Sequence, residues 1–484
     1  MMVEFGNKIL VIGYGSVSRC TLPVLFKHIK IPYKNVTVID FVDQRAAIRE
    51  WTDKGVKYFQ TKITPMNMAK EFAKHVGAGG LIIDLAWNIG CTDILTWCHD
   101  NKVLYVNTSI EEWDPYANIH DKTPLQKSLY YRHMIIRGMI SRWGSDSTTA
   151  IVDHGANPGL ISHFTKRGLV DIACKAIKDR TTPKSSVKAL EKYLHESDFA
   201  RIAMELDVKV IHCSERDTQI ANKPKSVDEF VGTWSIEGLR EEGISPAEMG
   251  WGTHEDKLPA LAHIPHYGPK NQIFLAKMGM NTWVRSWIPD QEIVGMVIRH
   301  GEAFGISDRL TVWKGKKAVY RPTVHYAYMP CHETISSLHE LRARNYELQP
   351  KWRIMNDEIT GGEDILGALL MGHKYNSWWT GSALSIEESR RLVPHQNATT
   401  LQVAIGVVSA VLWMIGNPKK GFCIPDDLPY KFVLDIAKPY LGRFISKASD
   451  WTPLANYQVF FKENKAAKLD ADNVWCFRNF LFKP

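Results

Sequence analysis

The sequence predicts an α/β domain with a parallel sheet, joined to a second α+β domain with a mixed or antiparallel sheet. Two observations predict the first domain. An apolar run at 8–12 meets the turn Gly13-Tyr14-Gly15-Ser16-Val17, and a second apolar run at 36–39 ends on Asp40. The second domain follows from a third observation, the loss of regular strand and helix alternation after about residue 185.

The glycine turn is typical of a Rossmann-type NAD-binding domain. Its two glycines allow a tight turn, and the helix that begins with Ser16 and Val17 offers free N–H groups to a pyrophosphate. Asp40 is placed to bind a ribose 2′-hydroxyl and to repel a 2′-phosphate, which favours NAD over NADP. Ser18 stands where a third glycine or alanine is usual. The alternative is a tight turn that binds no ligand.

The rest of the first region continues the alternation. The expected elements are a helix at 65–75, a strand at 81–86, a helix at 92–100, strands at 103–108 and 150–153, and a helix that begins near 160. This order predicts a parallel sheet, whose ligands bind at the carboxyl ends of the strands. Asn88, Thr108 and Glu111 come just after such ends.

The segment Gly155-Ala156-Asn157-Pro158-Gly159 lies between a predicted strand and a predicted helix. Its glycines allow the backbone to approach another group closely, and its proline stiffens the loop. Taken alone, the segment is equally consistent with a sharp turn.

Length and pattern together predict the domain organisation. A chain of 484 residues exceeds one ordinary core. We expect a nucleotide-binding domain at 1–155, a substrate and dimerisation domain at 156–395, and a helical segment at 396–484 that packs back on the first domain. Strand-like pieces at 208–212, 272–275 and 291–299 belong to the middle region. The apolar run at 401–415 is too short to span a bilayer and is expected to be a buried helix.

Composition argues against several classes of protein. The formal net charge is +8, but the basic residues are scattered, so we expect no nucleic-acid partner. The eight cysteines are widely spaced without a Cys-x-x-Cys pair, which is typical of reduced thiols in the cytoplasm. The chain enters a strand almost at once, so neither a signal peptide nor a membrane partner is expected.

Acidic segments rich in tryptophan predict a site for a cation. Residues 235–256 hold six acidic residues against a single Arg240, flanked by Trp234 and Trp251. Aromatic faces beside carboxylates attract cations. Smaller acidic clusters at 111–114 and 214–217 follow predicted strand ends. The alternatives are a solvated charged surface and, within 214–217, a simple ion pair between neighbouring residues.

His300 ends a predicted strand at 298–302, where it is either a proton relay or a structural residue. Cys331, His325 and His332 lie close together in sequence, but no complete metal-ligand spacing is present, so we expect no metal.

Several motifs, in this order, resemble the bacterial homospermidine synthase family, which is related to the saccharopine dehydrogenases. They are 13–17, Asn107-Thr108-Ser109-Ile110-Glu111, 154–159, Thr233-Trp234-Ser235-Ile236-Glu237-Gly238, Gly250-Trp251-Gly252-Thr253-His254-Glu255 and Asn397-Ala398-Thr399. The resemblance implies condensation of two putrescines to homospermidine with release of ammonia. It also implies NAD that is reduced and reoxidised within one cycle, spermidine as a possible further amine, and a homodimer.

The resemblance also implies roles for residues. Trp234 would hold the reacting cation, Glu242, Glu215 and Glu111 would bind amines, and Asn157 would border the nicotinamide, with His300 moving protons. Asn88 stands where some relatives are expected to carry a carboxylate. The residues expected to bind the cofactor are Gly13, Gly15, Ser16, Val17, Asp40, Asn88, Thr108, Ala156, Asn157 and Pro158.

Two other functions compete with this hypothesis. A reductive condensing dehydrogenase of the saccharopine or carboxyspermidine type would need an arginine cluster for its substrate carboxylate, whereas the motifs offer mostly acids. A non-catalytic NAD-binding sensor would not need acidic segments walled by aromatic side chains. The sequence therefore favours the synthase.

Overall fold

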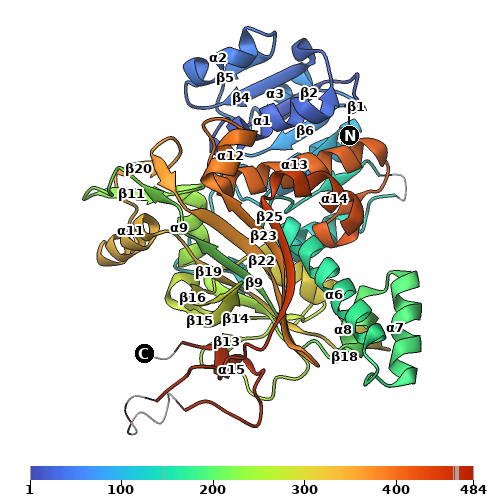
Figure 1. Cartoon of the computed structure of the whole chain (residues 1–484). Helices are drawn as coiled ribbons and strands as arrows, with labels where there is room; N and C mark the ends of the chain where they lie inside the picture. The colour runs from blue at the N-terminus through green and yellow to red at the C-terminus, as the bar shows by residue number, and fades with distance from the viewer. Residues whose placement is uncertain (1, 145–146, 460, 462, 464–467, 483–484) are drawn as a thin grey trace.

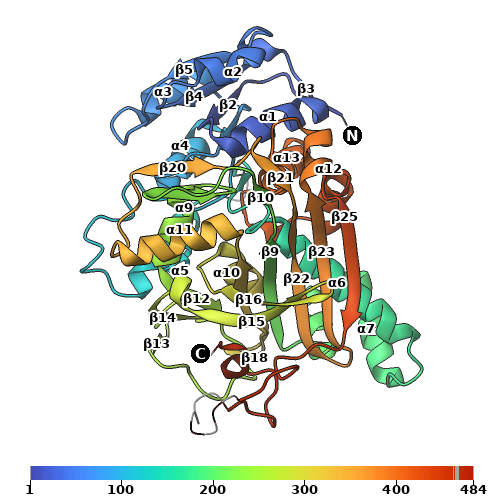
Figure 2. The ribbon, with the colours of Figure 1, turned by 60° about the vertical axis from the view of Figure 1, so that its left-hand side comes forward.

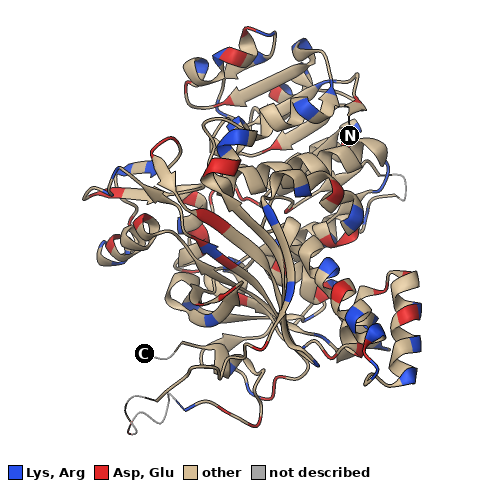
Figure 3. Ribbon diagram, viewed as in Figure 1, with Lys and Arg blue, Asp and Glu red and all other residues tan. Residues whose placement is uncertain are grey.

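Two large β-sheets, each with its own helices, form the main part of the protein. The computed structural model describes residues 2–144, 147–459, 461, 463 and 468–482. The first sheet lies beyond one end of the long strands of the second sheet, and the C-terminal segment lies near their other end (Figure 1). Turning the molecule shows the same arrangement (Figure 2). Basic and acidic residues are spread over the whole ribbon (Figure 3).

The first sheet has seven parallel strands in the order β24-β8-β7-β6-β2-β4-β5. The strands are β2 (Ile9–Ile12), β4 (Val36–Asp40), β5 (Lys57–Gln60), β6 (Leu81–Asp84), β7 (Leu104–Asn107), β8 (Ala150–Ile151) and β24 (Phe422–Cys423). The four central strands are buried along their whole length, which explains their unbroken apolar runs. Apart from β24, the order is that of a Rossmann fold, with the switch point between β2 and β6. The predicted parallel sheet is confirmed.

The second sheet has ten strands, of which eight follow the order β13-β14-β12-β19-β9-β22-β23-β25. Their bounds are β9 (Val210–Asp217), β12 (Pro246–Gly250), β13 (Ala262–His263), β14 (Gln272–Met278), β19 (Thr323–Met329), β22 (Glu363–His373), β23 (Asn376–Ser385) and β25 (Arg443–Ser449). The hairpin of β15 (Trp283–Ile288) and β16 (Gln291–Met296) joins at β19. β9 pairs with β19 in parallel and with β22 antiparallel, so the sheet is mixed, as predicted.

One helix connects the two sheets. α13 (Ala398–Gly416) packs along α1 (Ser16–His28) of the first sheet, and it also contacts β22 and β23 of the second. It is long and apolar enough to cross a membrane, but 89% of its most apolar window is buried inside the protein. The prediction of a buried helix is confirmed.

The C-terminal region, predicted to be helical, contains strands as well as helices. It holds α13 and α14 (Tyr430–Ala437), but also β24, which joins the first sheet, and β25, which joins the second. Both strands lie at sheet edges and depend on their neighbours for pairing, which local sequence pattern does not reveal. The domain boundaries at 155 and 395 remain predictions.

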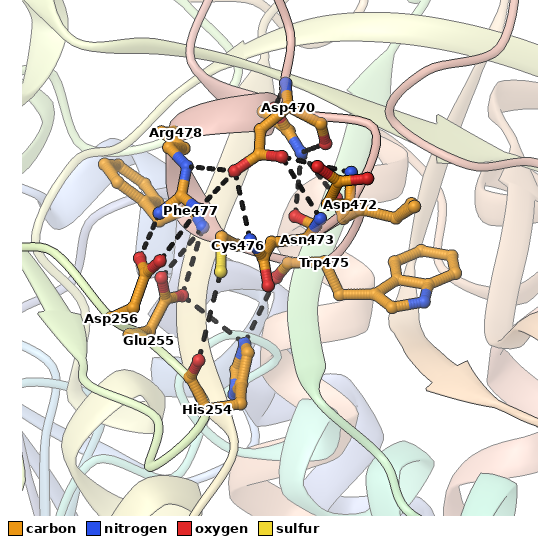
Figure 4. Close-up of polar contacts among 12 residues, drawn as sticks. His254, Glu255, Asp256, Asp470, Asp472, Asn473, Trp475, Cys476, Phe477 and Arg478 are labelled. Atoms are coloured by element: carbon orange, nitrogen blue, oxygen red, sulfur yellow. Dashed lines mark hydrogen bonds and ion pairs between the residues drawn. The ribbon is translucent and has the colours of Figure 1, made fainter.

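A C-terminal segment packs on the face of the second sheet that lies away from α6 (Leu160–Lys178). The helix α15 (Phe477–Phe480) places two phenylalanines in the core of that face. Glu255 accepts the backbone N–H of Phe477 at 3.1 Å, and Arg478 bridges Asp256 and Asp470 (Figure 4). Part of the acidic stretch at 235–256 therefore holds the end of the chain in place.

Replacing Phe480 by Ala is expected to lower the free energy of unfolding by about 3–5 kcal/mol, because a fully buried phenylalanine leaves a cavity. Urea denaturation measures the loss. Phe482→Ala is the matched control, since that side chain is 47% exposed and should change stability little. Equal effects of the two substitutions would show that the segment is not anchored by α15.

Candidate active site

The glycine turn leaves open room at the start of α1. Gly13 has a φ of +85°, and a Cβ at this position would lie 3.0 Å from the carbonyl oxygen of Leu85. A Cβ at Gly15 would meet nothing within 4 Å. The first turn of α1, which begins with Ser16, carries no acidic residue. The N-terminus of α1 thus faces an open space and has no acidic side chain in its own first turn, which fits the pyrophosphate of a dinucleotide.

Asp40 lies at the end of β4, directly beside the glycine turn. Its carboxylate accepts the N–H of Tyr14 at 2.6 Å and the N–H of Val42 at 2.7 Å. These two bonds fix the orientation of the carboxylate and leave further lone pairs for a ribose hydroxyl. The position agrees with a ribose-binding carboxylate at the end of the second Rossmann strand.

The loop that contains Asn157 approaches the backbone of α13 closely. A Cβ on Gly406 would lie 2.0 Å from the carbonyl oxygen of Gly155, so the helix needs glycine here. The same loop packs against Thr108, whose methyl carbon lies 3.3 Å from where a Cβ on Gly155 would be. The Asn157 side chain donates to Glu215 at 2.7 Å and to the hydroxyl of Tyr326 at 2.5 Å. Two predicted site residues, Asn157 and Glu215, therefore touch.

Three buried carboxyl groups lie side by side on β9 and β22. Glu215 and Asp217 point to the same face of β9, and Asp364 is paired with Asp217 across the strands. They are 3%, 1% and 0% exposed. Burial raises the pKa of Glu215 to about 7, although hydrogen bonds from Tyr326 and Asn157 oppose it. Within the described part of the chain, no ion pair reaches any of the three.

Glu215 is not paired with its neighbour Arg216. The guanidinium of Arg216 donates to the carbonyl oxygen of Pro330 at 2.8 Å. Successive side chains of a strand point to opposite faces, so Glu215 is left to face Asn157 and Tyr326. The alternative of a simple ion pair is wrong.

His300 is held between two carboxylates. Its Nε2 lies 2.8 Å from Glu242, and its Nδ1 lies 3.3 Å from Glu302. Burial acts to lower the pKa of His300, but the two carboxylates hold it well above its ordinary value. The ring also lies against Tyr326, with 4.3 Å between centroids. The imidazole is therefore cationic and connects Glu242 with the surroundings of Glu215.

The predicted strand at 298–302 is wrong. β16 ends at Met296, and His300 is the N-cap of α10 (Gly301–Arg309). The apolar residues Val297 and Ile298 continue the strand pattern, yet they are buried in loop backbone that leads into the helix. Short apolar runs do not distinguish a strand from buried loop.

A second charged group lies beside His300. Glu241 accepts from Arg132 at 2.5 Å and also from Arg299, and both arginines are buried. Burial opposes ionisation, but the two guanidiniums lower the pKa of Glu241 to about 2. Both arginines are thus already bound to a protein carboxylate. They do not form the free arginine cluster that a substrate carboxylate would need.

Glu111 follows β7, at the carboxyl end of the first sheet. Burial and the nearby Glu241 raise its pKa to about 7, while Arg132 and the backbone N–H of Asn88 act in the opposite direction. Asn88 has a φ of 56°, which turns its backbone toward this carboxylate. Glu111 therefore lies beside Glu241, in the region where the two domains meet.

Trp234 precedes α9 (Ile236–Ile244), the helix that carries Glu241 and Glu242. Its indole N–H donates to the hydroxyl of Tyr328 at 3.0 Å. Tyr328 is in register with Glu215 on the neighbouring strand and stacks on Tyr326, with centroids 5.2 Å apart. The structure thus brings Trp234 to the same group of residues as Asn157, Glu215 and His300.

The acidic stretch at 235–256 divides into three parts. Glu241 and Glu242 face the site, as described above. Glu248 accepts the N–H groups of Leu129 and Tyr130, both at 2.8 Å, and so caps a helix. Glu255 and Asp256 hold the C-terminal segment. Of the stretch predicted to form a cation site, Glu248, Glu255 and Asp256 therefore bind other parts of the protein.

Sequence reasoning missed four residues of this cluster: Tyr326, Tyr328, Asp364 and Arg132. Tyr326 and Tyr328 alternate along one face of β19, and this pairing was a usable signal. Asp364 and Arg132 lie in none of the motifs singled out from the sequence, so only the folded structure reveals their partners.

Comparison with known proteins first defines the class. The profile of the saccharopine dehydrogenase NADP binding domain matches residues 9–151, and that of the saccharopine dehydrogenase C-terminal domain matches residues 155–449. With its Rossmann strand order and its acidic site between the two sheets, the protein belongs to the saccharopine dehydrogenase class.

Relatives that match the full length of the chain define its family more narrowly. The chain is 38% identical to the homospermidine synthase of Blastochloris viridis, over 98% of this chain and 97% of the relative. It is 35% identical to that of Mesorhizobium japonicum, over 99% and 97%. The crystal structure of the Legionella pneumophila homospermidine synthase in complex with NAD superposes with a TM-score of 0.88 at 34% identity, covering 100% and 99% of the two chains. The chain belongs to the homospermidine synthase family.

Proposed function

We propose that this protein is a homospermidine synthase. It condenses two putrescines to homospermidine with release of ammonia, and the NAD that takes a hydride returns it in the same cycle. The observation that carries the proposal is the group of three buried carboxyl side chains, Glu215, Asp217 and Asp364, with which no described residue forms an ion pair; the group lies beside Trp234 and Asn157. Buried carboxylates are costly unless a cation pairs with them, and a diammonium substrate supplies that cation.

The first domain holds NAD. When bound, NAD supplies the hydride acceptor and later the hydride donor. Ser16 and Val17 at the start of α1 would hold the pyrophosphate, for which there is open space at Gly15, and Asp40 would bind the ribose. The carboxylate of Asp40 repels a 2′-phosphate, so NAD is preferred to NADP. The further residues proposed to line this site are Gly13, Asn88, Thr108, Ala156, Asn157 and Pro158.

The amine lies between Trp234 and Glu215. Loss of hydride from the carbon beside nitrogen gives an iminium, and the face of Trp234 and the carboxylate of Glu215 stabilise its positive charge. Glu111 and Glu242 hold the remaining amino groups. His300, bound to Glu242 at 2.8 Å, takes part in the proton transfers.

The competing functions fit the site less well. A reductive condensing enzyme would bind a substrate carboxylate, but Arg132 and Arg299 are bound to Glu241. A sensor would have no use for buried carboxyl groups next to the nicotinamide position. We also propose a homodimer in the cytoplasm. All eight cysteines are free thiols, which supports a reducing compartment.

Incubating the purified protein with putrescine and a catalytic amount of NAD tests the proposal. The expected product is homospermidine, identified by mass spectrometry, with no sustained rise in NADH absorbance because each hydride is returned. Accumulation of NADH in proportion to product would contradict the closed cycle and indicate an ordinary amine dehydrogenase.

A further inference from the structure

The motif Asn397-Ala398-Thr399 lies at the start of α13, next to the three buried carboxyl groups of Glu215, Asp217 and Asp364, here called the carboxyl row. The Asn397 side chain caps this helix by accepting the N–H of Thr400 at 2.8 Å. The hydroxyl of Thr399 donates to Oδ2 of Asp364 at 2.6 Å. The motif therefore positions Asp364, a carboxyl group to which neither the family resemblance nor the proposed mechanism gives a role.

The hydrogen bonds show which carboxyl of the row lacks donors. Asp217 accepts three bonds, from the backbone and side chain of Gln219 and from Thr233, and these suit an ionised carboxylate. Asp364 accepts one, from Thr399. Its other oxygen, Oδ1, is fully buried and finds no donor among the described residues.

Asp364 and Glu215 are diagonal neighbours on one face of the sheet, because Asp364 pairs with Asp217 and Leu366 pairs with Glu215. Two ionised carboxylates repel each other and have no proton to share, so two buried carboxyl groups this close favour a proton on one of them. Burial, with Glu215 and Asp217 as neighbours, raises the pKa of Asp364 well above its ordinary value. The geometry and the electrostatics thus agree on a protonated pair.

We propose that Glu215 and Asp364 share one proton when no amine is bound, and that the pair releases this proton to solvent when a primary ammonium group binds to Glu215. The exchange is balanced: one cation enters, one proton leaves, and no bond to carbon changes. Asp364 acts through Glu215 and is a positioning residue. The inference rests on the proposed function, because it assumes an ammonium substrate at Glu215.

Among the described residues, none forms an ion pair with Glu215 or Asp364. From α13, Thr399 donates to the Asp364 side chain and Gln402 donates to the backbone carbonyl of Asp364, while β23 presents Leu384 opposite Asp364. The charged and titratable groups that face the pair or act on it are Asp217, Cys213, Tyr326, Tyr328, His300 and Cys331, with Arg216 acting on Asp217. His300 acts on Glu215, but it is already paired with Glu242 and Glu302.

The pH dependence of kcat/KM for putrescine tests the proposal. In the wild type the acid limb reports loss of the shared proton. Asp364→Asn keeps the shape of the side chain but cannot ionise, so the acid limb should move to lower pH by at least about one pH unit. Thr399→Val removes the hydrogen bond donated to the Asp364 side chain. The shared proton is then harder to lose, so the acid limb should move to higher pH. A structural defect would lower the rate in both variants without opposite shifts.

Glu255→Gln is the matched control. Glu255 is also a buried carboxyl whose pKa burial raises to about 7, but it holds the C-terminal segment and should leave the acid limb in place. If Asp364→Asn does not fold, Thr399→Val carries the test alone. An acid limb that Thr399→Val or Asp364→Asn leaves unmoved, in an enzyme that makes homospermidine, would overturn the shared proton. Failure of the wild type to use putrescine would instead overturn the proposed function.

Discussion

Glu215→Gln is expected to lower kcat/KM for putrescine by about 30-fold or more. Removing one member of a buried charge pair costs about 2–5 kcal/mol, and the ammonium would lose its buried partner. Glutamine keeps the size of the side chain and an oxygen that accepts from Tyr326, so the fold should be preserved. Steady-state kinetics measures the loss, and thermal unfolding checks the fold.

A matched control for this substitution is Glu363→Gln. Glu363 also lies on β22, but its side chain is partly exposed and pairs with Arg443 at 3.0 Å. Its replacement should leave kcat/KM unchanged, because its carboxylate is already paired with Arg443, and the loss of such an exposed ion pair costs only about 0–1 kcal/mol of stability. Wild-type kinetics in the Glu215 variant would show that the ammonium binds elsewhere.

Trp234→Ala is expected to lower the rate of putrescine turnover by about two- to thirtyfold, the range that corresponds to a cation–π contact of about 0.5–2 kcal/mol. Trp234→Phe should retain part of the activity, because phenylalanine keeps a weaker aromatic face. Neither phenylalanine nor alanine can donate to Tyr328, so the difference between the two variants isolates the face from the hydrogen bond.

NAD affinity separates this role from a structural one. Trp234 contacts Tyr328 of the second sheet, so its loss should leave NAD binding nearly unchanged. Calorimetric titration with NAD measures this directly. Unfolding of Trp234→Ala, or an unchanged rate, would identify Trp234 as a packing residue and contradict its proposed role.

The first domain is the part of the fold that sequence predicts best. The glycine turn and the buried strands are local patterns: Gly13 needs its positive φ, and β2, β4, β6 and β7 are apolar because both faces are covered. β24 and β25 could not be predicted in this way. They are strands because distant parts of the chain offer them edges to pair with.

The candidate site shows the same division. Asn157, Glu215 and His300 lie in segments whose composition singles them out, and the structure brings them to one place. Tyr326, Arg132 and Asp364 lie outside those motifs, and each meets its partner across strands or between domains. Sequence separation hides such contacts, because no local periodicity records them.

The contacts of α13 have a consequence for the length of the substrate. This helix packs on α1 of the first sheet, on the loop of Asn157 through Gly406, and on Asp364 through Thr399. Under the proposed function, these contacts fix the spacing between the NAD-binding domain and the carboxyl groups of the second sheet before any ligand binds. We therefore expect diamines of different length to place their reacting ends alike and to differ at the opposite end, towards Glu111 and Glu242.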